Sequence, residues 1–348
     1  MKNYLDSLEG NKSMNKSSIL IIGKTPPPIG GVSVHIERLL YSLRQDDIPF
    51  ESMSLSLSTL RKFIPAYLRC RIIHLNITSV YVRALLTLTS FILNKKHVNT
   101  YHGNLGSKKR IKNMFDKVSI YCSAYPVVLN DDSRDFAIRY NKRTIKISAF
   151  IPPASVEPLK DEIKREIGAL RVNFKELYCT NAYGIMYDDN KHEIYGISEL
   201  VRVFSSLSDR ALILSDPAGS YKNYFEKNNI TPGKNILIIS EPHSFVEVLK
   251  LTDTYIRNTS TDGDSLSVKE ALYLRKNVIA TNCVQRPEGV ILCEVNNSDD
   301  LIRKITEPAL RPVSEYPVIS GYPDLKRLYE ALFNGKEVVF EKVQEGKA

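Results

Sequence analysis

The stretch Arg257–Leu274 reads R-N-T-S-T-D-G-D-S-L-S-V-K-E-A-L-Y-L and joins a strand-like apolar run to a helix. Its first half is a polar loop of Ser, Thr, Asp and Gly, residue types whose loops leave backbone amides pointing outward. Its second half carries apolar residues at helical spacing. A loop that leads into a helix presents unpaired N–H groups and the positive end of the helix dipole, so this stretch predicts an anion site.

Two carboxylates flank this helix start. Asp262 in the loop and Glu270 in the helix have seven residues between them, so both could contact one ligand. A purely structural role explains them equally well, because Asp residues cap helices and acidic side chains are favourable in a first turn.

Strand-like and helix-like segments alternate along the rest of the chain. Short apolar runs typical of buried parallel strands begin at Ser18–Gly23, and the pattern restarts at Glu176–Ala182 after Pro152-Pro153, which indicates a hinge. Serial strand–helix units predict parallel sheets, and 348 residues are enough for two domains. We therefore expect doubly wound α/β domains at 18–153 and 154–320, with a ligand in the cleft between them.

The loop after the first predicted strand, K-T-P-P-P-I-G-G-V at 24–32, is rich in proline and glycine. Prolines hold such a loop extended, and Gly30 and Gly31 permit a close approach of backbone to a ligand. The run 96–103 ends in T-Y-H-G, which places His102 at the carboxyl end of a strand, where doubly wound sheets bind ligands. A structural histidine is the alternative.

Composition restricts the class of partner. The net charge of +9 favours anionic partners such as nucleotide phosphates or lipid headgroups, and the basic residues form no recognised nucleic-acid module. The five cysteines are scattered, which indicates neither a disulfide framework nor a zinc site and fits a reducing cytoplasm. Residues 1–17 are polar and lack a signal-peptide core, so a disordered leader is expected.

Two segments of the first half bear on membranes. The helix predicted at Tyr81–Leu93 has many apolar residues but also Arg83, and it is too short to span a bilayer, so we expect a packed amphipathic helix. The next helix, from Lys108 to Lys117, mixes basic and apolar residues. That mixture suits an anionic membrane surface, and a solvated charged face explains it equally well.

Taken together, these motifs resemble those of the GT4-type (group 1) retaining glycosyltransferases, which have the GT-B fold. The frame from Asp262 to Glu270 resembles their E-x7-E element, with Asp at the first position. The P-P-P-I-G-G-V and T-Y-H-G runs resemble their P-P-x-G-G-V and T-x-H-G elements. The resemblance implies two Rossmann-like domains facing a central cleft, an acceptor domain first and a donor domain second. It also implies that a last helix within 321–348 crosses back to the first domain.

The resemblance also implies roles for individual residues. His102 and Asp262 would approach the donor sugar as the catalytic residues, and Glu270 would hold the ribose. No metal or other cofactor is implied. The implied donor-binding residues are Gly30, Gly31, Arg257, Gly263, Asp264, Ser265, Leu266 and Glu270.

One position departs from the family pattern. An Arg and a Lys usually follow the first strand of the second domain and neutralise the departing diphosphate, but here Tyr195 stands where Lys is expected before Gly196. Charge that develops on a leaving phosphate needs a positive or hydrogen-bonding partner. We expect Lys24, Lys191, Arg257 or loop amides to supply it.

The implied function is retaining, front-face transfer of a sugar from a nucleotide-sugar donor to a glycan acceptor, which would be lipid-linked. The setting would be bacterial surface-polysaccharide synthesis (O-antigen, capsule or exopolysaccharide), in the cytoplasm or peripherally at the inner face of the cell membrane. Two alternatives remain: a nucleotide-sugar epimerase of the same architecture, and a non-catalytic GT-B-like subunit, which the missing Arg and Lys favour.

Overall fold

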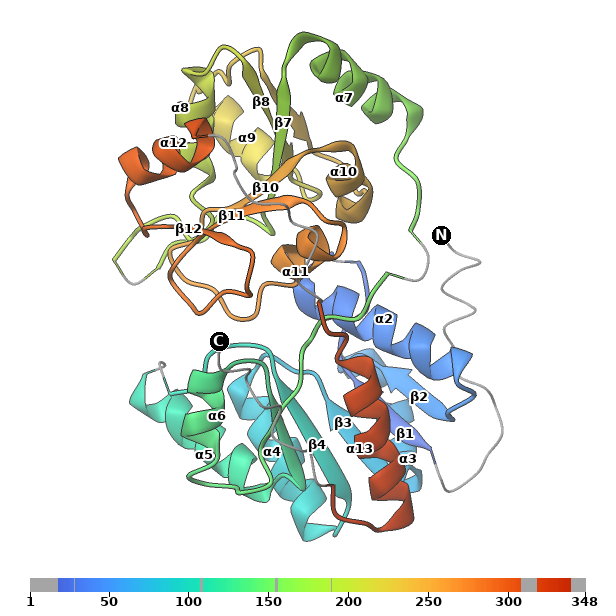
Figure 1. Cartoon of the computed structure of the whole chain (residues 1–348). Coiled ribbons are helices and arrows are strands. Elements are labelled where there is room, and N and C mark those ends of the chain that lie inside the picture. Colours follow the sequence, from blue (N-terminus) through green and yellow to red (C-terminus); the bar gives the residue numbers. More distant parts are fainter. Residues whose placement is uncertain are drawn as a thin grey trace. The chain divides into compact units, whose positions relative to one another are not determined.

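The computed structural model describes residues 18–27, 29–106, 109–153, 156–188, 190–307 and 318–338. The predicted leader at 1–17, Lys108 and residues 339–348 lie outside this described part. Contacts divide the chain into two compact units (Figure 1). The first unit comprises Met1–Pro28, Val32–Ile151 and Ser320–Ala348, and the second comprises Ile29–Gly31 and Pro152–Ile319. Apart from the short segment Ile29–Gly31, the chain therefore passes to the second unit at Pro152 and returns to the first at Ser320, just before its last helix.

The first unit contains a parallel six-stranded sheet in the order β2-β1-β3-β4-β5-β6. Its central strands are buried along their whole length, as expected for a sheet covered by helices on both faces. The strands are β1 (Ile19–Ile22), β2 (Phe50–Met53), β3 (Ile72–Leu75), β4 (Lys96–Tyr101), β5 (Tyr125–Val128) and β6 (Ile145–Lys146).

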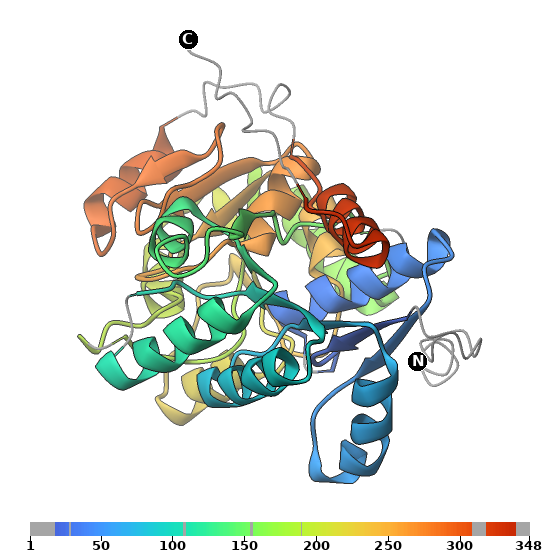
Figure 2. The ribbon, with the colours of Figure 1, turned by 90° about the horizontal axis from the view of Figure 1, so that it is seen from below.

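The direction of each crossover decides which face its helix covers. The chain steps one way along the sheet from β1 to β2 and the opposite way from β2 through β3 and β4 to β5. Because parallel crossovers are right-handed, α2 covers one face and α3, α4 and α5 cover the other (Figure 2). The helices of this unit are α2 (Gly31–Gln45), η2 (Leu57–Thr59), α3 (Leu60–Arg69), α4 (Val80–Ile92), α5 (Arg110–Cys122), α6 (Asp131–Ala137) and α13 (Tyr322–Asn334).

The last helix belongs to the first unit. Leu325, Leu328, Tyr329 and Leu332 of α13 join the core formed by α2 and by the side chains of β1 on that face. The Tyr329 hydroxyl lies 2.6 Å from Nδ1 of His74 on β3. Residues far apart in the sequence therefore complete one core.

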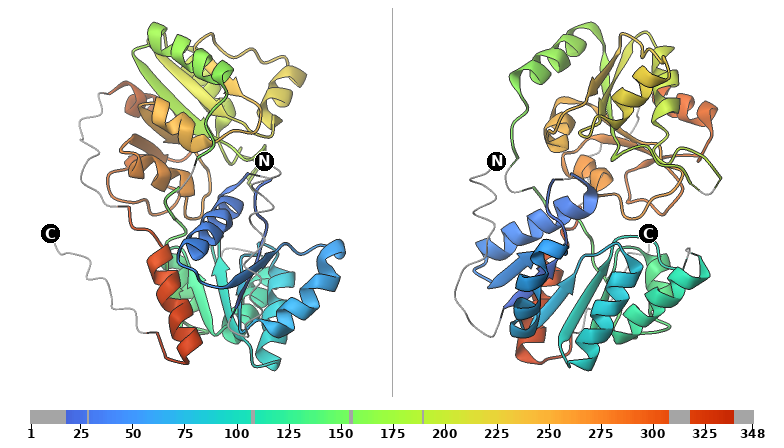
Figure 3. Two further views of the ribbon diagram at one scale, coloured as in Figure 1. Left: turned by 90° about the vertical axis from the view of Figure 1, so that its right-hand side faces the viewer. Right: turned by 180° about the vertical axis from the view of Figure 1, so that it is seen from behind.

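The second unit contains another parallel six-stranded sheet, ordered β12-β11-β10-β7-β8-β9. Its helices cover both faces in two separate cores (Figure 3). The strands are β7 (Glu176–Asn181), β8 (Arg210–Ser215), β9 (Ile236–Ile239), β10 (Thr254–Arg257), β11 (Asn277–Thr281) and β12 (Ile291–Cys293). The helices are α7 (Asp161–Asn173), α8 (Ile197–Ser205), α9 (Ser220–Lys227), α10 (Phe245–Leu251), α11 (Leu266–Tyr273) and α12 (Ser298–Thr306). Two doubly wound parallel α/β sheets confirm the predicted fold class.

Helix α4 is oriented opposite to the usual amphipathic helix, whose apolar side faces the core. Its buried positions include the polar residues Arg83, Thr87 and Ser90, whereas its large apolar side chains are mostly exposed. Arg83 forms an ion pair with Asp116 of α5, and the two side chains are only 3% and 0% exposed. The interior beneath α4 is therefore a polar layer, and its apolar side faces outward.

Two buried histidines of the first sheet, His74 on β3 and His97 on β4, predict a pH dependence of stability. Burial lowers the pKa of His74 to about 3 and that of His97 to about 4. Between pH 6.5 and these values the unfolded chain binds protons that the folded chain does not. The free energy of unfolding should therefore fall with falling pH, by up to about 1.4 kcal/mol per pH unit for each histidine.

The measurement is urea denaturation between pH 7 and pH 5. His97→Gln should reduce the slope against pH, whereas His192→Gln, on an exposed turn, should leave it unchanged. An unchanged slope in His97→Gln would contradict the prediction.

Candidate functional site

The strand order of the second sheet marks where a ligand binds. Read from β9 to β12, it is the 3-2-1-4-5-6 order of dinucleotide-binding domains, in which ligands bind beyond the carboxyl ends of the strands where the order reverses. That switch point lies between β7 and β10, which are neighbours in the sheet. The loop that follows β10 and leads into α11 is the Asp262 loop, so the fold places it at the switch point.

Asp262 is the centre of a buried charged cluster. Its carboxylate accepts hydrogen bonds from Nε and Nη2 of Arg257, at 3.0 and 3.1 Å, and from Nη1 of Arg286 at 2.8 Å. The three side chains are 9%, 12% and 2% exposed. Burial favours the neutral acid, but the charges of Arg257 and Arg286 outweigh it and hold the pKa of Asp262 well below its usual range. Asp262 is therefore ionised at physiological pH, and the cluster carries one net positive charge.

Arg286 is the member of this cluster that sequence reasoning missed. It follows β11, and its Nε donates to the carbonyl of Thr281 at 2.9 Å, where that strand ends. Because β11 lies next to β10 in a parallel sheet, the residues after both strands meet at one edge. The signal available in the sequence was an arginine shortly after the strand that follows α11 in the chain.

The position of the missing lysine is occupied by an aromatic ring that contacts the cluster. Cζ of Arg257 lies 5.2 Å from the centroid of the Tyr195 ring, within the range of a cation–π contact. Burial lowers the pKa of Arg257, but the charge of Asp262 outweighs it and the pKa is raised. Two arginines, one at the end of β10 and one after β11, therefore supply positive charge at the switch point, while Lys191 lies in an exposed turn.

Helix α11 begins at this loop as the sequence predicts. The Ser265 hydroxyl caps it by accepting from the amide of Val268. Asp264 is held by an ion pair with Lys269 of the same helix, at 2.5 Å. Gly263 donates its amide to Asp262, at 3.0 Å. The loop is thus braced by its own side chains, and the cap fixes where the helix starts.

Glu270 lies one turn further along α11 and is 6% exposed. On the same helix, the Ser267 hydroxyl lies 2.8 Å from that of Tyr255, and the Tyr255 hydroxyl donates to Asn181 at the end of β7. These contacts tie the helix to both strands of the switch point. A carboxylate on a rigid, capped helix at this edge is suited to accept hydrogen bonds from hydroxyl groups.

Glycine at position 196 is required by the backbone of the β7–α8 loop. Its φ is +56°, and a Cβ there would lie 2.5 Å from both Nδ2 and the carbonyl oxygen of Asn258. We expect Gly196→Ala to lower the free energy of unfolding by about 1–3 kcal/mol. Gly168→Ala in α7 meets open space and should raise it by about 0.5–1 kcal/mol. Chemical denaturation measures both, and equal effects would contradict the prediction.

No protein-family model and no curated protein sequence matches this chain. Solved structures do match it over nearly the whole length of both chains. Anabaena HepE in complex with UDP-glucose has a TM-score of 0.62 and 12% identity over 91% of this chain and 97% of its own. Sucrose-phosphate synthase from Thermosynechococcus elongatus has a TM-score of 0.61 and 15% identity over 92% and 97%. A glycosyltransferase from Rickettsia africae has a TM-score of 0.62 and 14% identity over 92% and 100%.

This chain has the GT-B fold. Identities this low establish the fold alone. The GT-B assignment agrees with the strand orders and the two compact units described above.

The other predicted site residues of this GT-B chain lie on loops connected with the first sheet. His102 follows β4, and its Nε2 lies 2.8 Å from Oδ1 of Asn76, which follows β3. Burial, followed by the charges of neighbouring groups, lowers the pKa of His102 well below its usual value, so its ring is neutral at physiological pH. Lys24 is exposed after β1. By their contacts, Gly30 and Gly31 belong to the second unit. A Cβ added to Gly30 would lie 3.2 Å from the ring of Tyr183.

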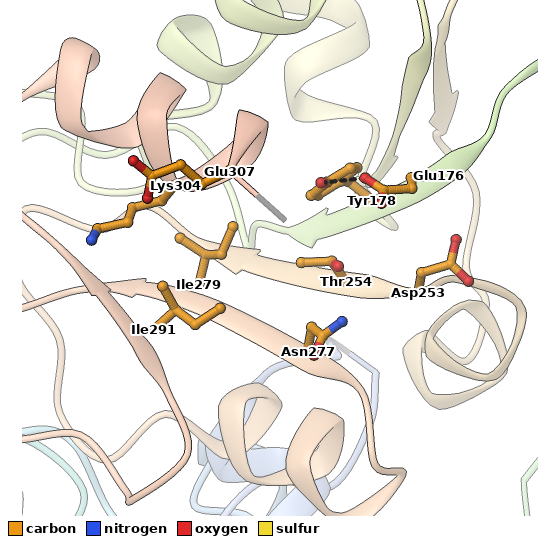
Figure 4. Close-up of a pocket in the computed structure, with 9 residues that line it drawn as sticks. All are labelled: Glu176, Tyr178, Asp253, Thr254, Asn277, Ile279, Ile291, Lys304 and Glu307. Carbon is orange, nitrogen blue, oxygen red and sulfur yellow. Dashed lines mark hydrogen bonds between the residues drawn. The ribbon is translucent and has the colours of Figure 1, made fainter. Parts of the chain in front are cut away.

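A pocket in the second unit lies away from the switch point. It opens beside Glu176, Thr254 and Asn277, which begin β7, β10 and β11 (Figure 4). Nucleotide sites in doubly wound sheets lie at the opposite, carboxyl ends. This pocket is therefore not a candidate donor site of the GT-B fold.

Proposed function

We propose that this chain is a retaining glycosyltransferase that transfers a sugar from a nucleotide-sugar donor to a glycan acceptor. The observation that carries the proposal is the gathering of Arg257, Asp262 and Glu270 at the switch point of a sheet with the Rossmann strand order. The description of Anabaena HepE with UDP-glucose and with UDP supports the donor class. The GT-B fold agrees with the two-domain architecture that such a transferase requires.

The donor site follows from the charges at the switch point. Arg257 and Arg286 face the diphosphate and stabilise the charge that develops as it leaves, in place of the usual Arg and Lys. The loop amides from Asp264 to Leu266 add the positive end of α11, whereas the predicted contribution of the Gly263 amide is not kept because that amide donates to Asp262. Glu270 accepts hydrogen bonds from the ribose hydroxyls. Asp262 is proposed to lie beside the sugar, and it also positions both guanidinium groups.

The reaction proposed is front-face displacement, in which the donor phosphate assists the acceptor hydroxyl and the anomeric configuration is retained. Neutral His102 is proposed to approach the sugar from the first sheet. No metal ion or other cofactor takes part. The acceptor is proposed to be a lipid-linked glycan in cell-surface polysaccharide synthesis, with the enzyme in the cytoplasm and peripheral at the inner face of the membrane. The net charge of +9 supports a negatively charged surface as its working place.

The first test is a thermal-shift screen of UDP-, GDP- and ADP-sugars on the full chain. A donor that binds only the folded state must raise the melting temperature, and the base that does so identifies the donor class. Transfer to glycan acceptors is then followed by NMR of the anomeric proton. No shift with any nucleotide sugar would remove the main support for the proposal, and an inverted product would remove the retaining mechanism.

A non-catalytic, donor-binding subunit is the second candidate. It is favoured by Tyr195 in the usual lysine position and by the engagement of Asp262 with two arginines. It predicts donor-induced stabilisation without transfer to any acceptor. Conversion of the donor to another nucleotide sugar without an acceptor would instead identify an epimerase.

A further inference from the structure

The outer surface of α3, α4 and α5 is unusually apolar for helices facing water. Among the described residues, 24 large apolar side chains are exposed, and 14 of them lie on these three helices or at the end of α4. We call these 14 residues the α3–α5 face. They are Leu60, Ile64, Leu68, Tyr81, Val82, Leu85, Leu88, Phe91, Ile92, Leu93, Ile111, Met114, Val118 and Tyr121.

The three helices lie on the same side of the first sheet (Figure 2). The Tyr67 hydroxyl of α3 donates to the carbonyl of Leu86 in α4, at 3.0 Å. The rings of Tyr81 in α4 and Phe115 near the middle of α5 are 5.0 Å apart. The patch of exposed apolar side chains therefore spans three helices that contact one another, and large apolar patches mark interaction surfaces.

The inverted packing of α4 explains why this patch is built into the fold. The helix buries Arg83 against Asp116 and places Thr87 3.1 Å from Nε2 of His97. A rotation of the helix that buried Leu85 or Phe91 would separate these polar groups from their hydrogen-bond and ion-pair partners. Within the described part of the chain the apolar side stays exposed, so a contact with a partner would remove it from water.

The charge around the patch indicates what that partner is. Residues 52–130 contain twelve Lys and Arg residues and one acidic residue, Asp116, a net charge of +11. The rest of the chain carries a net charge of −2. Asp116 is buried in its ion pair, so the exposed charge of these helices is basic. A partner must therefore be apolar at its centre and anionic around it.

A second copy of the chain does not meet these requirements. A twofold dimer through this face would place each patch against itself, bringing two segments of charge +11 together. An anionic bilayer offers both an acyl interior and a negative surface, and basic amphipathic helices bind it in this way. No helix in the described part of the chain is long and apolar enough to cross a membrane, so the contact would be peripheral.

We propose that the α3–α5 face docks on an anionic lipid bilayer. Its apolar side chains enter the boundary between headgroups and acyl chains, and the surrounding lysines and arginines contact lipid phosphates. This inference deepens the proposed function, because it supplies the surface on which a lipid-linked acceptor is presented. Only this link to the acceptor rests on the proposed function, because docking itself requires no transferase activity.

The test is co-sedimentation of the full chain with vesicles of phosphatidylcholine alone or with about 30% phosphatidylglycerol, an anionic lipid. We expect binding to the anionic vesicles to be at least about tenfold tighter and to weaken with added salt. Two triple variants of exposed residues on this layer should each weaken it about tenfold or more. The apolar variant is Leu85→Ser with Phe91→Ser and Ile92→Ser, and the charge variant is Lys62→Glu with Lys96→Glu and Lys112→Glu.

Matched controls carry the same kinds of change on exposed residues of the second unit and should bind anionic vesicles as the wild type does. The apolar control is Val172→Ser with Leu292→Ser and Ile319→Ser, and the charge control is Lys222→Glu with Lys227→Glu and Lys234→Glu. Circular dichroism and the melting temperature establish that each variant is folded.

Several results would overturn the docking proposal. These are equal binding to both vesicle types, retained binding in both α3–α5 variants, or equal loss in the controls. A wild-type oligomer that Leu85→Ser, Phe91→Ser and Ile92→Ser dissociate, measured by light scattering, would assign the face to a second copy instead. Donor-induced thermal stabilisation is measured on the same proteins without vesicles. Its presence or absence reports on the proposed function separately from docking.

Discussion

Replacing Glu270 with Gln should weaken binding of the nucleotide-sugar donor by roughly ten- to a hundredfold. A hydrogen bond to a charged acceptor contributes about 1.5–3 kcal/mol, and Gln keeps the shape of the side chain while removing the charge. Because Gln matches the size of the Glu270 side chain and the Ser265 cap of α11 is unchanged, the substitution should leave the fold of α11 intact. The donor-induced rise in melting temperature should then nearly disappear at a donor concentration that stabilises the wild type.

The matched control is Glu247→Gln, on α10 of the same unit, whose carboxylate pairs with Lys250 of its own helix. It should bind the donor as the wild type does. Isothermal titration calorimetry gives the dissociation constants directly. A donor affinity in Glu270→Gln equal to that of the wild type would exclude Glu270 from the donor site and leave it a structural residue of α11.

The second large effect concerns the buried ion pair of the first unit. Asp116→Ala should lower the free energy of unfolding by about 3–5 kcal/mol, because it leaves the Arg83 guanidinium buried without its counter-charge. The remaining contacts of Arg83, a hydrogen bond to the carbonyl of Ile77 and the ring of Tyr101 at 4.7 Å, do not replace a carboxylate.

A double variant separates the pair's net contribution from the cost of breaking it. Arg83→Met with Asp116→Leu removes both charges and should recover most of the loss, since buried ion pairs contribute little relative to apolar residues of similar size. Glu162→Ala, which breaks the exposed pair with Arg165, should change stability by less than about 1 kcal/mol. Urea denaturation measures all three. A loss of unfolding free energy below about 1 kcal/mol in Asp116→Ala would contradict this account. So would a double variant that is no more stable than Asp116→Ala.

Local sequence pattern was sufficient for the strands that open each half of the chain, for the alternation of strands and helices and for the start of α11, whereas β2, α3 and α7 were not predicted. The run I-L-I-I in β1 is typical of a buried strand, and the polar loop with Ser265 before an apolar periodicity could be recognised as a helix start. These features depend on residues within a few positions of one another. The same holds for the Asp262–Glu270 frame, whose spacing is a property of one loop and one helix.

The tertiary structure decided which charges meet and which helix faces turn inward. Arg286 reaches Asp262 only because β10 and β11 are parallel neighbours, and no local pattern specifies that adjacency. In α4, periodicity predicts two unlike faces but not their orientation. That orientation depends on His97 and Asp116, which come from β4 and α5 and supply the polar partners of the buried side. Sequence thus determined the local elements, whereas the site's charge and the exposed apolar face arose from contacts between distant segments.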